Sequence, residues 1–64
     1  MKDIIEELAN RKGVKKIAVE NFLMSLGEST KEEALANLNY DTQLYNWNSV
    51  TYLAIREGIK RLIK

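Results

Sequence analysis

The chain has 64 residues, enough for one small domain spanning residues 1–64. Ten lysines and arginines nearly balance nine aspartates and glutamates, and there is no cysteine, histidine or proline. These absences exclude Cys/His zinc sites, disulfides, thiol chemistry and histidine acid–base catalysis. No stretch is apolar and long enough to span a membrane, and no signal-peptide core follows the first methionine. We therefore expect a cytoplasmic protein without membrane contact.

The composition favours helices along the whole chain. Ala, Leu, Glu, Lys and Arg are frequent, and only three glycines interrupt the helical stretches. We therefore predict an all-α fold, a compact bundle of three or four helices. A core of this size is marginal by itself, because domains near 60 residues bury only about 60% of their unfolded surface.

The first two helices are predicted at residues 3–12 and 15–26. In the first, apolar residues at positions 4, 5, 8 and 9 form one stripe, and Gly13 supplies the left-handed residue that commonly ends a helix. In the second, the apolar residues span too wide an arc for one face, so we expect neighbours to grip this helix on two sides. These residues are Ile17, Ala18, Val19, Phe22, Leu23, Met24 and Leu26.

A capping box predicts the start of the third helix, made either by Ser29 with Glu32 or by Thr30 with Glu33. We expect this helix to fade by Tyr40. Residues 41–46 are predicted to form either one capped turn or an ordered loop.

The last helix is predicted over residues 49–63, with Asn46, Asn48 or Ser49 as its N-cap. Arg56, Lys60 and Lys64 form a basic stripe on its outer face. Its expected inward residues are Tyr52, Ile55, Ile59, Leu62 and Ile63.

Residues 5–23 carry the one pattern with a functional implication. A small residue, Ala9, is followed four positions later by Gly13 in the expected turn. Apolar residues occupy the positions that pack around such a turn, namely Leu8, Val14, Val19 and Phe22. The pattern resembles the helix-turn-helix superfamily of DNA-binding proteins. This resemblance implies that the second helix enters the major groove of duplex DNA.

The resemblance also assigns roles to individual side chains at and after the turn. Lys15, Lys16, Glu20 and Asn21 would read bases: Lys16 would donate to guanine, Asn21 would pair with adenine, and Glu20 would accept from cytosine. Lys15 would also contact phosphate, together with Arg11 and Lys12. The sequence departs from the family at Lys15, where a capping Ser or Thr is usual.

An alternative interaction surface is predicted around the last helix. Tyr45, Trp47 and Tyr52 would form a protein-binding hot spot, a stacking platform for single-stranded nucleic acid, or a small aromatic core that caps the bundle. Ala54 and Gly58 make a small-residue notch where a helix can approach closely, from within the chain or from a second copy.

No residues combine into a catalytic site, a metal site or a glycine-rich phosphate loop, and the chain is too small to enclose a substrate. We therefore expect neither an enzyme nor a cofactor nor a small-molecule substrate. The leading hypothesis is a small DNA-binding regulator or accessory protein, similar in size to phage and plasmid proteins, with duplex DNA as its partner. The alternative is a helical protein-interaction or oligomerisation module that binds a second copy of the chain, as a homodimer, or another protein, and does not bind nucleic acid.

Overall fold

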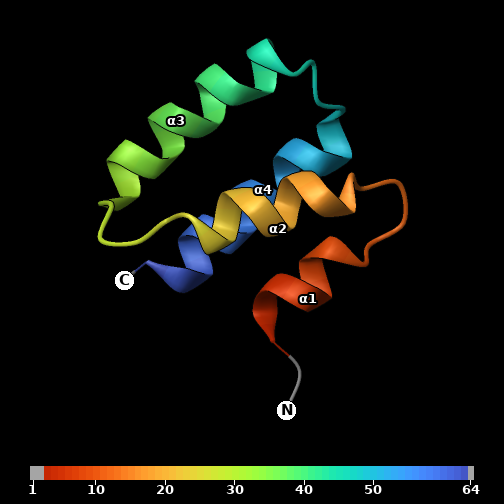
Figure 1. Ribbon diagram of the computed structural model, residues 1–64, viewed down its shortest axis with the longest axis horizontal. Helices are drawn as coiled ribbons and strands as arrows, with labels where there is room; N and C mark the ends of the chain where they lie inside the picture. The colour runs from red at the N-terminus through yellow and green to blue at the C-terminus, as the bar shows by residue number, and fades with distance from the viewer. Residues whose placement is uncertain (1–2, 64) are drawn as a thin grey trace.

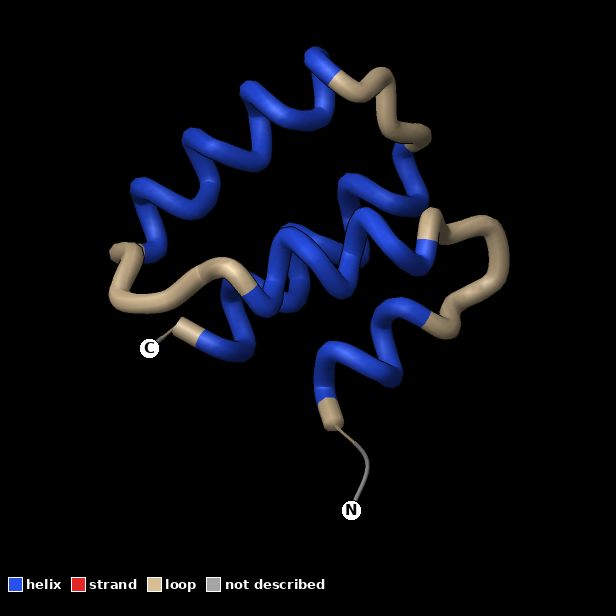
Figure 2. The backbone as a smooth tube through the Cα atoms, viewed as in Figure 1, coloured by secondary structure: helices blue, strands red, loops and turns tan. Residues whose placement is uncertain are grey.

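The computed structural model describes residues 3–63, which form four helices: α1 (Ile4–Ala9), α2 (Lys16–Met24), α3 (Lys31–Leu44) and α4 (Ser49–Leu62). In Figure 1, α2 crosses in front of α4, and α1 and α3 lie on either side of this pair. α1 packs on α2 and α4, whereas α3 packs on α4 and makes no close backbone approach to α2. The all-α prediction is confirmed, since residues 3–63 contain helices and loops and no strand (Figure 2). None of the described helices is long and apolar enough to cross a lipid bilayer.

The core is small and takes one face from each helix. Gly58 allows close packing between α4 and its neighbours, because a Cβ added there would lie only 2.5 Å from Leu23 Cδ1 and 3.1 Å from Leu8 Cδ1. Both small residues of the predicted notch, Ala54 and Gly58, are therefore buried within the chain and are not exposed to a second copy. Three of the nine buried apolar residues are alanines; the set is Leu8, Ala9, Val19, Leu23, Ala34, Leu38, Ala54, Ile55 and Ile59.

The connection between α1 and α2 begins earlier than predicted, because α1 ends at Ala9 and not at residue 12. The side-chain amide of Asn10 donates to the Glu6 carbonyl (2.9 Å), which competes with continuation of the helix. Gly13 adopts the predicted positive φ, at 84°, but it lies three residues beyond the C-cap Asn10 and therefore turns the connection without ending α1. The Asn48 side chain donates to the Gly13 carbonyl (2.9 Å), so the connection is fastened to the start of α4.

The third helix begins as predicted and ends later. Thr30 and Glu33 form the capping box, and the alternative pair is excluded. α3 continues to Leu44, so the expectation that it fades by Tyr40 is wrong. It ends because Asn46 takes a left-handed conformation (φ 54°), which lets the Trp47 amide donate to the Thr42 carbonyl in a Schellman-type cap.

The fourth helix begins and ends close to prediction. Asn48 is its N-cap, with its side chain accepting from the Thr51 amide (3.1 Å). Leu62, predicted to point inward, is instead 37% exposed in the last turn. Lys64, the last member of the basic stripe, lies outside the described residues.

α2 packs against both α1 and α4, as its wide apolar arc predicts, but its outer face remains uncovered. Ile17 and Met24 are 67% and 73% exposed, although Val19 and Leu23 on the opposite face are buried. The reason is the placement of α3, which packs on α4 and leaves the outer side of α2 uncovered.

Candidate functional site

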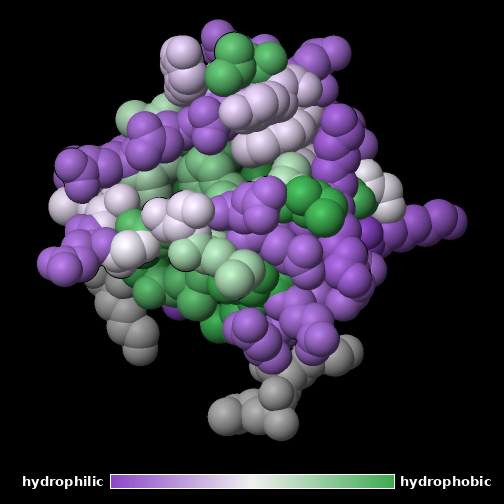
Figure 3. Space-filling model, in the orientation of Figure 1, coloured by the Kyte–Doolittle hydropathy of each residue, from purple (hydrophilic) through white to green (hydrophobic). Residues whose placement is uncertain are grey.

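An open groove of about 830 Å³ separates α2 from α3. It exists because α3 rests on α4 and diverges from α2 (Figure 1). Figure 3 shows apolar surface in the hollow between the two helices. The more buried lining residues form an apolar floor, and they are Ala18, Phe22, Leu26, Ala34 and Trp47.

Trp47 organises the aromatic part of this groove. Its ring stacks on Tyr45, with centroids 5.5 Å apart and planes at 22°. On its other side it meets Phe22 edge-to-face at 6.2 Å. Trp47 and Tyr52 are half-buried and pack against the core, while Tyr45 remains 58% exposed at the rim. Of the aromatic residues predicted for an interaction surface, Tyr45 and Trp47 therefore line the groove and Tyr52 does not.

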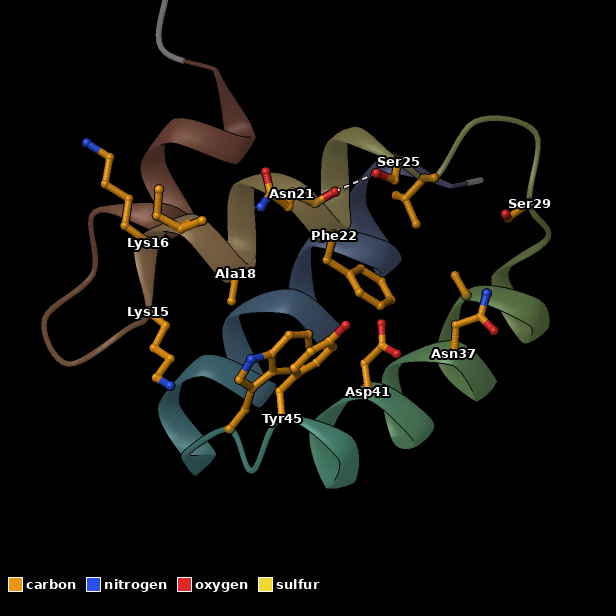
Figure 4. Close-up of a pocket in the computed structure, with 14 residues that line it drawn as sticks. Lys15, Lys16, Ala18, Asn21, Phe22, Ser25, Ser29, Asn37, Asp41 and Tyr45 are labelled. Atoms are coloured by element: carbon orange, nitrogen blue, oxygen red, sulfur yellow. Dashed lines mark hydrogen bonds between the residues drawn. The ribbon is translucent and has the colours of Figure 1, made fainter.

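The charged groups at the rim lie on opposite helices. Lys15 and Lys16 stand at the α2 side, and Asp41 stands on α3. Figure 4 shows the Asp41 carboxylate directed into the groove, whereas Lys16 extends away from it. Within residues 3–63, none of these three side chains makes an ion pair or hydrogen bond. Asp41 is half-buried as a residue, and its carboxylate faces the groove without a cation from residues 3–63 beside it.

The residues predicted to contact DNA are only partly assembled on one surface. Lys12, Lys15 and Lys16 are exposed near the start of α2, and Asn21 is exposed further along it. Glu20 is half-buried.

Arg11 is engaged in an ion pair within the chain. Its guanidinium binds both carboxylate oxygens of Glu57, at 2.9 Å and 3.1 Å. This hydrogen bond is the main reason why the pKa of Glu57 is lowered, with a smaller contribution from Arg61, which lies 3.2 Å away. A phosphate would have to compete with Glu57 for Arg11.

The connection between α1 and α2 is also longer than the turn of a helix-turn-helix unit. Six residues, 10–15, separate α1 from α2, where helix-turn-helix units usually have three or four. Lys15 caps α2 without a side-chain hydrogen bond, as its identity predicted. A tertiary contact partly replaces the missing cap, because the Lys15 amide donates to the Thr51 hydroxyl at 3.0 Å.

The sequence reading missed two residues of the exposed surface, Ile17 and Met24. They lie seven positions apart on the outer face of α2, with Asn21 between them. The signal was present in the wide apolar arc of this helix, which was interpreted as burial on two sides.

Comparison of the chain with protein-family models, with curated proteins and with solved structures gives no match. Function is therefore inferred from the geometry of the groove and its surroundings.

Proposed function

We propose that the protein is a small interaction module that binds an amphipathic helix of a protein partner in the groove between α2 and α3. The observation that carries this proposal is the apolar groove itself, with large exposed apolar side chains on both of its sides. Ile17 on α2 and Tyr45 just after α3 line the groove, and Met24, Tyr40 and Leu44 are exposed on the same two helices outside its lining. Contiguous exposed apolar surface with a polar rim is typical of protein-binding sites.

The lining residues specify the chemistry of the bound helix. The floor of Phe22, Trp47 and their neighbours accepts a stripe of apolar residues at i, i+4 and i+7. Asp41 calls for a lysine or arginine beside that stripe, because a paired carboxylate is less costly to bury than an isolated one. Asn21 and Asn37 offer neutral hydrogen-bonding groups at the rim.

Selection of helical peptides from a displayed library tests this proposal. We expect enriched peptides to share an apolar stripe with an adjacent basic residue. Asn37→Arg, which narrows the groove, should weaken their binding at least about tenfold, equivalent to about 1.4 kcal/mol. Asn39→Arg makes the same chemical change on the same helix outside the groove and should leave binding unchanged. Failure to enrich any peptide, or equal binding to both variants, would refute the proposal.

Duplex DNA binding is a second candidate, favoured by the cluster of Lys12, Lys15 and Lys16. All three are exposed, and no ion pair within residues 3–63 engages them. The first-turn amides of α2 have no side-chain cap, so they are suited to donate hydrogen bonds to a phosphate oxygen beside these lysines. Asn21, exposed on the same helix, would be the base-reading residue.

Fluorescence anisotropy with a mixed-sequence duplex tests the second candidate. Three phosphate contacts should lower the affinity about 40-fold between about 50 and 200 mM salt. Replacing Lys15 and Lys16 together by alanine should weaken binding, whereas the matched removal of Arg56 and Lys60 on α4 should not. Affinity that is insensitive to salt, or to loss of the two lysines, excludes this candidate.

A further inference from the structure

We infer that the groove between α2 and α3 contains a subsite for a guanidinium group, formed by the Asp41 carboxylate and the aromatic rings of Phe22, Tyr45 and Trp47. The helix bound in the groove then presents an arginine at this point. This inference rests on the proposed function, because it names the side chain by which the partner helix is recognised in the same groove.

The position of Asp41 follows from the face that α3 turns toward the groove. Asn37, Asp41 and Tyr45 are spaced four residues apart, so they lie on one face, and all three line the groove. The Tyr45 amide donates to the Asp41 carbonyl at 2.9 Å, so helical geometry continues to Tyr45. Figure 4 shows the Asp41 carboxylate directed toward the Phe22 ring of α2, with the Tyr45 side chain beside it. The carboxylate therefore lies among aromatic side chains from both walls of the groove.

The three aromatic rings hold one another in place. Trp47 packs against the core, stacks on Tyr45 at 5.5 Å and meets Phe22 edge-to-face at 6.2 Å. Tyr45 remains 58% exposed despite the stacking, so aromatic surface is still available to a ligand. A cation within about 6 Å of a ring centroid is attracted to the face of that ring. The rings and the carboxylate therefore attract the same class of ligand.

Asp41 has no cation of its own. Within residues 3–63 its side chain makes neither an ion pair nor a hydrogen bond. Lys15 and Lys16 lie where α2 begins, whereas Asp41 lies opposite Phe22, further along that helix, and Lys16 extends away from the groove (Figure 4). A helix bound in the groove covers the Asp41 carboxylate, which is costly unless the carboxylate is paired. The partner must therefore supply the cation.

The aromatic surroundings of Asp41 favour arginine over lysine. A planar guanidinium binds a carboxylate through two parallel hydrogen bonds and is able to stack on an aromatic ring at the same time. An ammonium group is more strongly hydrated, so it loses more when the bound helix excludes water. A neutral side chain at this position leaves Asp41 unpaired, and an acidic one repels it. The subsite therefore discriminates against helices that share only the apolar stripe.

Substitutions in a selected peptide test this inference without altering the protein. We expect the helical peptides enriched from the displayed library to share one arginine beside the apolar stripe. Replacing it by citrulline, which keeps the shape and removes the charge, should raise the dissociation constant at least about tenfold. Replacing it by lysine should raise the constant about three- to tenfold. Trp47 is the only tryptophan of the chain, so its fluorescence follows the binding of tryptophan-free peptides.

Matched protein variants assign the effect to the subsite. Asp41→Asn should abolish the discrimination between arginine and citrulline, whereas Glu32→Gln, which neutralises an exposed carboxylate on α3 outside the groove, should retain it. Tyr45→Leu should reduce the preference for arginine over lysine, because it removes a ring and keeps an apolar side chain. Tyr40→Leu, at an exposed position of α3 outside the groove lining, should leave that preference unchanged.

The outcomes separate this inference from the proposed function. Enriched peptides without a shared arginine, or an effect of citrulline that persists in Asp41→Asn, overturn the guanidinium subsite. If Asn37→Arg still weakens the binding of those peptides, the proposed function stands without the subsite. If no peptide is enriched, both are refuted.

Discussion

Replacing Gly58 by alanine should destabilise the protein, although alanine is the better helix former. The added Cβ would lie 2.5 Å and 2.9 Å from the two Cδ atoms of Leu23 and 3.1 Å from Leu8 Cδ1. Leu23 and Leu8 are almost fully buried, so neither can move into free space. Overpacking of this kind costs about 1–3 kcal/mol, against a gain in helix propensity of about 1 kcal/mol. We expect a net loss of about 1 kcal/mol, which lowers the midpoint of thermal unfolding by about 4–8 °C in a domain of this size.

Thermal melts followed by circular dichroism measure this effect, and a double-mutant cycle isolates its cause. Leu23→Val removes the two Cδ atoms that the new methyl group would meet. In that background Gly58→Ala should become close to neutral or stabilising, since the propensity gain remains and only the milder approach to Leu8 Cδ1 at 3.1 Å is left. A higher melting temperature for Gly58→Ala in the wild-type background would show that α2 and α4 pack less closely than described.

Three further outcomes follow from individual hydrogen bonds and one ion pair. Thr51→Val should cost about 1–3 kcal/mol in chemical denaturation, because the α2 cap loses its acceptor, whereas Thr51→Ser should cost less. Asn48→Ala should cost about 1–2 kcal/mol, since the N-cap of α4 is lost; equal melting of Asn48→Ala and wild type would contradict this. The lowered pKa of Glu57, caused mainly by Arg11, means that its ion pair stabilises the fold above the pKa of the unfolded chain and is lost as acid protonates it. At low salt, the melting temperature of the wild type should fall as the pH is lowered below about 5. Glu57→Gln should make this fall smaller, whereas Glu6→Gln should leave it unchanged.

The helices could be predicted from local patterns because their signals are local. The capping box at Thr30 and the cap at Asn48 each depend on residues within three positions of one another. The errors at helix ends also have local causes, but two signals competed. Asn10 could continue a helix or bind the Glu6 carbonyl, and Asn46 could begin α4 or end α3; the structure shows the second outcome in both cases.

The candidate site could not be predicted in the same way, because it depends on contacts between residues far apart in the sequence. Periodicity measures the width of the apolar arc on α2 but not which neighbours cover it, so the exposure of Ile17 and Met24 follows only from the position of α3. The ion pair of Arg11 with Glu57 joins residues 46 positions apart, and no local pattern indicates it. The sequence did identify Tyr45 and Trp47 as surface candidates, because four of the five aromatic residues cluster around the connection between α3 and α4.

The two candidate functions use overlapping surfaces, which bears on how their tests are interpreted. Asn21, the proposed base-reading residue, also lines the groove between α2 and α3. A helix bound in the groove covers Asn21, so α2 cannot read bases and bind a partner helix at the same time. Lys12 lies outside the groove lining and remains accessible for phosphate contact in either state. Salt-dependent DNA binding that persists while a helical peptide occupies the groove would therefore indicate backbone contacts from the connection before α2, whereas base-specific binding requires the α2 face to be uncovered.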